Sequence, residues 1–224
     1  MFAQLVMLST IILISLIGNK AFRQSRRINY LPGKILSLGL FFVAFGIFTY
    51  SIRDILTQFE IYKLQLIIGK TGIFFHTLGG VLILRFLTQE FTPERFRQTF
   101  FLICLLCITV VLIGLISFPF VSEIIQAPFE PFPYKVIRHT PIGTPSNVTI
   151  FIFIFGPVLL TSIVLYNTLK LEEKKLRAKG LLYGMGFLFL FLPSLICLFI
   201  SPIYARWGYL IGAILLYKAF GMKV

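Results

Sequence analysis

Long apolar stretches separated by short polar segments run along the whole chain. A helix across a bilayer needs about 20 apolar residues and tolerates about 17, and seven stretches reach or approach that length. They lie at 2–18, 35–51, 64–84, 99–118, 149–169, 180–200 and 206–220, the last being the shortest. They lack the alternation of barrel strands, and backbone groups in lipid must be bonded within their own segment. The pattern predicts an all-α, polytopic membrane protein with a bundle of seven transmembrane helices.

The composition strengthens that prediction. Of the 224 residues, 58% are hydrophobic and only 13% are charged, and the mean hydropathy is +0.93. Ordinary soluble domains carry about 25% charged residues, so the composition excludes a soluble globular protein. The connections leave too few residues for a second domain of ordinary size. We therefore expect residues 1–224 to form a single seven-helix transmembrane domain.

The basic residues are distributed unevenly between the two sides of this predicted bundle. Of the 21 Lys and Arg, fifteen lie in the first, third and fifth connections or after the last stretch, and five lie in the other connections. Short loops rich in Lys and Arg stay in the cytoplasm. The N-terminus is therefore expected outside and the C-terminus in the cytoplasm, across what we take to be a prokaryotic cytoplasmic membrane. The net charge of +13 then reflects topology, and no nucleic-acid partner is expected.

The basic inner surface also predicts partners. Anionic lipid headgroups are attracted by about 1 kcal/mol for each nearby Lys or Arg, and a separate protein could use the same cations. The residues expected to contact lipid or a partner there are Arg23, Arg26, Arg27, Lys174, Lys175, Arg177 and Lys179.

The connection at 119–148 is the longest and holds six prolines with aromatic residues between them. Proline fixes φ and blocks regular helix, and it lowers the entropy lost when a segment is ordered. We expect a Pro-rich extracytoplasmic segment that covers the outer mouth of the bundle. A mobile linker is the alternative.

Two ionisable residues fall inside the third stretch, Lys70 and His76, and such residues in hydrocarbon are candidates for a functional site. His76 shares its helical face with several glycines, which allow close helix approach, so we expect it to point into the bundle. The sequence predicts an outward-opening pocket for a polar or anionic small ligand. The expected lining is His76 at the floor, Lys70, Arg53 and Asp54 at the rim, and Arg206, Trp207 and Tyr209 at the mouth. The alternative is a His bonded within the bundle, among ordinary interfacial residues.

Motifs for enzyme or metal chemistry are incomplete. Cys104 and Cys107 form a C-x-x-C inside the fourth stretch, but no second pair of ligands completes a tetrahedral site. The run Glu172-Glu173-Lys174-Lys175-Leu176-Arg177 resembles the first motif of the intramembrane CAAX-type proteases. The histidine motifs which that family also needs do not occur. We therefore expect no metal, no cofactor and no enzyme activity.

The remaining pattern resembles a known module. Seven stretches, a long outer fourth loop, a basic run at 172–179 leading into Gly180-Leu181-Leu182-Tyr183-Gly184, and the short last stretch Arg206-Trp207-Gly208-Tyr209-Leu210 are similar to the seven-helix sensor region of bacterial and archaeal histidine kinases and cyclic-di-nucleotide synthases. The resemblance implies a small membrane sensor. Because that region normally feeds an output domain and this chain stops at Val224, the signal is expected to pass to a separate kinase, cyclase or other membrane subunit. A small-molecule transporter or an accessory subunit of a membrane complex is the alternative.

Overall fold

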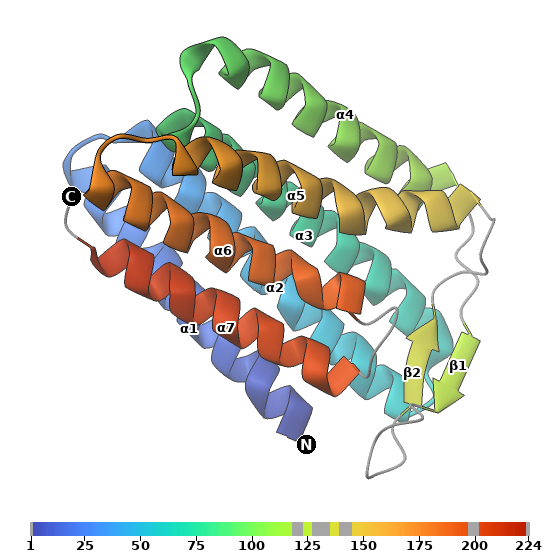
Figure 1. Ribbon diagram of the computed structural model, residues 1–224. Helices are drawn as coiled ribbons and strands as arrows, with labels where there is room; N and C mark the ends of the chain where they lie inside the picture. The colour runs from blue at the N-terminus through green and yellow to red at the C-terminus, as the bar shows by residue number, and fades with distance from the viewer. Residues whose placement is uncertain (1, 118–122, 127–134, 139–144, 197–201, 223–224) are drawn as a thin grey trace.

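The computed structural model describes residues 2–117, 123–126, 135–138, 145–196 and 202–222. These residues form seven α-helices and one antiparallel pair of strands (Figure 1). In chain order the elements are α1 Phe2–Arg27, α2 Leu31–Gln58, α3 Tyr62–Phe91, α4 Glu94–Ser117, β1 Glu123–Gln126, β2 Lys135–Arg138, α5 Pro145–Leu169, α6 Lys174–Ile196 and α7 Pro202–Gly221.

The helices lie side by side along one axis, and the start of α1 and the end of α7 lie at opposite ends of the bundle (Figure 1). The most extensive packing is between α2 and α3, followed by α6 with α7 and α1 with α2. Helix α7 also packs on α1, so the last helix contacts the first. Helix α3 contacts α2, α4, α5 and α6 and therefore occupies the centre of the bundle. Helix α4 lies along one edge (Figure 1), packed on α3 and α5.

Glycines explain why α2 and α3 pack most closely. A methyl group at Gly79 of α3 would lie 2.7 Å from the carbonyl oxygen of Gly39 on α2. One at Gly46 of α2 would lie 3.0 Å from the backbone nitrogen of His76. Small residues on facing surfaces let two helix backbones approach in this way. The prediction that His76 points into the bundle with the glycines of its face is confirmed, since His76 is fully buried.

The all-α prediction is confirmed for the bundle. Four described helices are long and apolar enough to cross a membrane, at Gln4–Arg27, Leu31–Gln58, Tyr62–Phe91 and Phe96–Ile116, and the part of α5 at Phe155–Leu169 is also apolar. Length and composition therefore indicate a membrane protein.

Most helices extend beyond the apolar stretches that predicted them. Helix α1 continues to Arg27, nine residues past its apolar stretch, and only 28–30 separate it from α2. A helix keeps its backbone hydrogen bonds through polar residues as well, so the length of an apolar stretch does not fix where the helix ends. Helix α5 likewise begins at Pro145, inside the segment expected to be a loop at 119–148, and it continues through Pro157.

Two strands inside 119–148 were not predicted. Residues 123–126 pair antiparallel with 135–138, at the end of the bundle where α2 ends (Figure 1). Glu123 lies opposite Arg138, and Ile124 lies opposite Ile137. Both runs carry β-branched residues, a composition that favours strands. The sequence signal was therefore present, in two short β-branched runs with complementary charged ends.

At the other end of the bundle, the turn between α1 and α2 is tied to α3. The Tyr30 hydroxyl donates a hydrogen bond to the carboxylate of Glu90 near the end of α3. Burial, and then the hydrogen bond and negative charge of Glu90, raise the pKa of Tyr30 above its usual value. The neutral, donating form of the phenol is therefore favoured in the folded protein.

We expect Tyr30→Phe to lower the free energy of unfolding by about 1.5–3 kcal/mol at neutral pH, because one hydrogen bond to a charged group is lost. A phenol with a raised pKa in the folded state stabilises fully below the unfolded pKa of about 10 and loses that contribution as pH rises. The difference between wild type and variant should thus shrink above about pH 10. Unfolding of both proteins in mixed micelles, from neutral pH to above about pH 10, measures this difference. A difference that grows with pH would contradict the hydrogen bond from Tyr30 to Glu90.

Candidate functional site

A buried ion pair joins α2 to α7. The guanidinium of Arg206, near the start of α7, donates to Oδ2 of Asp54, near the end of α2. Arg53 Nη2 binds the other carboxylate oxygen, Oδ1, at 2.8 Å. Asp54 and Arg206 are only 6% and 5% exposed. A charged group in such surroundings is tolerated only when paired, so Asp54 and the two arginines form one unit.

The helical spacing of α2 explains why Asp54 faces inward. Gly46, Tyr50, Asp54 and Thr57 follow one another at intervals of three and four residues, which places them on one face, and all four are buried. Arg53, which directly precedes Asp54, is half-buried. Its guanidinium lies 5.2 Å from the centre of the Tyr50 ring. The guanidinium of Arg53 therefore lies over the Tyr50 ring and forms its ion pair with the Asp54 carboxylate.

His76 lies among aromatic rings from three other helices. Its ring centre lies 5.9 Å from that of Tyr50 on α2, 5.1 Å from Phe191 on α6 and 6.2 Å from Tyr209 on α7. The backbone of Leu190 on α6 also lies beside the imidazole. Tyr209 lies three residues after Arg206 and so continues the inner face of α7. The ion pair and His76 are thereby connected through Tyr50 and Tyr209.

We call this group the polar centre. It consists of Tyr50, Arg53, Asp54, His76, Arg206 and Tyr209. The structure thus brings together five of the seven residues that the sequence suggested for a ligand pocket. A role in ligand binding stays a prediction.

Lys70 and Trp207 take other positions. Lys70 Nζ donates to the carbonyl oxygen of Leu115 on α4, at 3.0 Å. The last carbonyls of a helix lack partners within the helix and carry partial negative charge, and Leu115 is two residues from the end of α4. Lys70 therefore caps α4. Trp207 is 39% exposed on the outside of α7.

Sequence reasoning missed Tyr50 and Gln65. Gln65 is fully buried on α3, and its side-chain amide has no hydrogen-bond partner among the described residues. It lies eleven residues before His76, on the face that also carries Gly69 and Gly72. Gln65 precedes Gly69 by four residues, so following the helical face of His76 toward the start of α3 would have identified it.

The basic residues expected to meet lipid or a partner are largely accessible. Arg23, Arg26 and Arg27 on α1 are exposed. Lys174 and Lys175 at the start of α6 are also exposed, whereas Arg177 and Lys179 are half-buried. At the same end, Lys20 Nζ on α1 lies 5.6 Å from the centre of the Phe220 ring, in the last turn of α7.

The residues of the C-x-x-C and the acidic run lie outside the polar centre. Cys104 is buried and Cys107 half-buried on α4, and both are free thiols. Glu172 and Glu173 are exposed just before α6. Within the described ranges, no group of three or more His, Cys, Asp or Glu could hold a metal ion.

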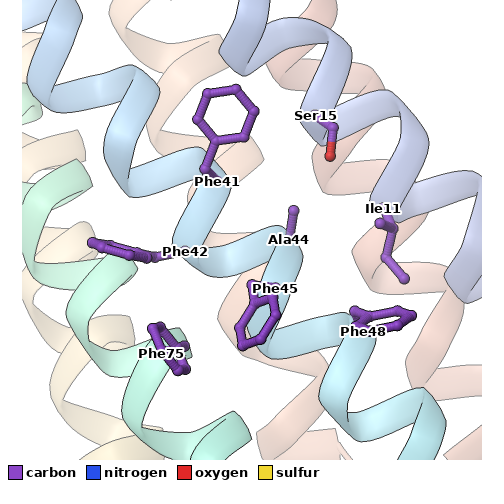
Figure 2. Close-up of a pocket in the computed structure, with 8 residues that line it drawn as sticks. All are labelled: Ile11, Ser15, Phe41, Phe42, Ala44, Phe45, Phe48 and Phe75. Carbon is purple, nitrogen blue, oxygen red and sulfur yellow. The ribbon is translucent and has the colours of Figure 1, made fainter.

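Two cavities lie outside the polar centre. A groove of about 510 Å³ opens between α1 and α2 and is also lined by Phe75 of α3 (Figure 2). A small void of about 20 Å³ lies between α3, α4 and α5. No protein-family model, no curated protein and no solved structure matches the chain.

Proposed function

We propose that this chain is a seven-span membrane protein, N-terminus outside and C-terminus cytoplasmic, that acts as a small non-enzymatic sensor or signalling component. The observation that supports this best is the buried ion pair between Asp54 and Arg206. Ionisable residues inside membrane helices are costly and mark functional sites. A small polar ligand reaching the polar centre would compete for these charged groups and so shift α7 against α2.

Helix α7 is the element that would carry such a shift across the membrane. Arg206 lies near its start and Phe220 in its last turn, about 21 Å apart at 1.5 Å per residue. At that far end Phe220 lies beneath Lys20 of α1, within the predicted cytoplasmic surface. A ligand acts only by binding one of two arrangements better than the other. The two arrangements proposed here have the ion pair closed or opened, and a separate protein would respond to the cytoplasmic end of α7.

Reporter cysteines test both orientation and coupling. In a background with the three cysteines replaced by Ala, Met222→Cys reports on the end of α7, and Glu94→Cys, at the start of α4, is the matched control. An impermeant maleimide added to intact cells should label Lys63→Cys, at the start of α3, and leave Met222→Cys and Glu94→Cys unlabelled. Labelling of Met222→Cys from outside would overturn the orientation.

Asp54→Glu supplies the coupling test, because it keeps every charge and displaces the carboxylate by one methylene. In permeabilised membranes we expect the cysteine of Met222→Cys to react with the maleimide several-fold faster in a chain that also carries Asp54→Glu. The labelling rate of Glu94→Cys should be the same with and without Asp54→Glu. Equal rates at Met222→Cys with and without Asp54→Glu would contradict signalling through α7.

A small-molecule transporter is the second candidate. It is favoured by the position of His76 beside the ion pair, because chains of acidic and His side chains carry protons in transporters. Proteoliposomes loaded with a pH-sensitive dye distinguish the two proposals. Acidification that depends on Asp54 and His76 would favour transport, and no proton flux would favour signalling.

A further inference from the structure

An apolar groove opens on the outer surface of the bundle between α1 and α2 and extends to Phe75 of α3 (Figure 2). One wall consists of Phe41, Phe45 and Phe48 of α2, which are 40–43% exposed. Ile11 and Ser15 of α1 form the opposite wall, and Ala44 lies between them (Figure 2). The groove has a volume of about 510 Å³ and shares no residue with the polar centre. In a membrane its contents would come from the bilayer.

Cations lie on both sides of the groove at one end. Lys34 precedes Phe41 by seven residues and Phe45 by eleven, so all three share one face of α2. Arg26 follows Ser15 by eleven residues on α1, again on the same face, and it is exposed. Lys34 Nζ binds the neutral amide oxygen of Asn29 at 2.7 Å. Within the described residues neither cation forms an ion pair with a carboxylate.

The distance between the cations and the far end of the groove matches one leaflet of a bilayer. Lys34 and Phe48 are separated by fourteen residues, about 21 Å along the helix. Half of a bilayer including its headgroups is about 20–22 Å thick. A phosphate at Lys34 would therefore place the end of its acyl chain beside Phe48, near the middle of the membrane.

We propose that this groove binds one anionic glycerophospholipid, with the phosphate at Lys34 and Arg26 and one acyl chain along the three phenylalanines. A second copy of the chain, or a partner helix, fits less well. Helices associate in membranes through small residues that let backbones approach, whereas large rings project from α2 here. An acyl chain is thin and flexible enough to lie between them.

Native mass spectrometry of the purified full-length protein tests the headgroup contact. We expect the first dioleoyl phosphatidylglycerol to bind more tightly than the first dioleoyl phosphatidylcholine. Lys34→Gln should weaken phosphatidylglycerol binding about fivefold, which corresponds to the typical attraction of one Lys for an anionic surface. Lys175→Gln, which removes an equal charge from an exposed position on α6, should have no effect. Equal losses in the two variants would show diffuse attraction and overturn the proposal.

The groove itself is tested by filling it. Ser15→Phe should weaken the binding of the first phosphatidylglycerol several-fold, whereas Leu106→Phe, on the exposed face of α4, should not. Phosphatidylglycerol with a diazirine in its acyl chain should label peptides of α1, α2 and the part of α3 around Phe75 in the wild-type protein. This measurement requires no variant to fold. Labelling spread over all helices would overturn the proposal. A wild-type protein with the mass of a dimer and a Ser15→Phe variant with the mass of a monomer would also overturn it, because the groove would then bind a second copy of the chain.

Discussion

Asp54→Asn should lower the free energy of unfolding by about 3–5 kcal/mol, the usual cost of removing one partner of a buried ion pair. The substitution keeps the shape of the side chain and removes its charge. Arg206, only 5% exposed, would then lose its carboxylate, and Arg53 would lose the same group. Reversible unfolding in mixed micelles of SDS and a mild detergent measures the difference.

The paired variant Asp54→Asn with Arg206→Met separates this cause from general damage. Replacing both members of a buried ion pair by uncharged groups is often close to neutral, so the second substitution should recover a large part of the lost stability. Glu94→Gln, at the exposed start of α4, removes the same charge and should change stability by no more than about 0.5 kcal/mol. A double variant as unstable as the sum of the two single variants would contradict a direct interaction.

Gly79→Ala should lower the free energy of unfolding by about 1–3 kcal/mol, the usual cost of overpacking a tight interface. The new methyl group would lie 2.7 Å from two backbone atoms of α2, the carbonyl oxygen of Gly39 and the nitrogen of Val43. Backbone atoms within a helix cannot move aside singly. Helices α2 and α3 would therefore have to separate along their most extensive contact.

Gly156→Ala is the matched control, because the same chemical change there should not lower the free energy of unfolding. Among the described residues, a methyl group at Gly156 in α5 meets only the sulfur of Cys107, at an ordinary 3.8 Å. Alanine within a helix is more favourable than glycine by about 1 kcal/mol, so Gly156→Ala should leave the protein equally or more stable. Unfolding in mixed micelles compares the two variants directly. Two variants of equal stability would contradict the close packing of α2 on α3.

The sequence predicted much of the bundle because hydrocarbon thickness imposes a length on each apolar stretch. It also predicted that His76 faces inward, because a histidine beside glycines at intervals of three and four marks a face on which helices approach closely. Helix ends were harder to predict. The polar last turns of α1 and the first turn of α5 have no apolar signature, so the parts of these helices that continue past their apolar stretches were read as loops.

The polar centre could be predicted only in part, since its members come from α2, α3 and α7. Arg53, Asp54 and Arg206 stood out as charges near apolar stretches, but their pairing depends on how α7 packs against α2. Lys70 shows the same limit. Its partner is a backbone carbonyl near the end of α4, and every helix end offers such carbonyls. Only the packing of α4 on α3 selects it.

The central position of α3 has a consequence for the order in which the protein assembles. Of the four helices in the described part of the chain that are both long and apolar enough to cross a membrane, α3 is the least apolar and α4 the most. Lys70 and His76 make it costly for α3 to lie alone in lipid. Helix α2 is synthesised just before α3 and carries glycines that pack against α3. We therefore expect α2 and α3 to enter the bilayer together as a hairpin, while α4 can insert alone and join them afterwards.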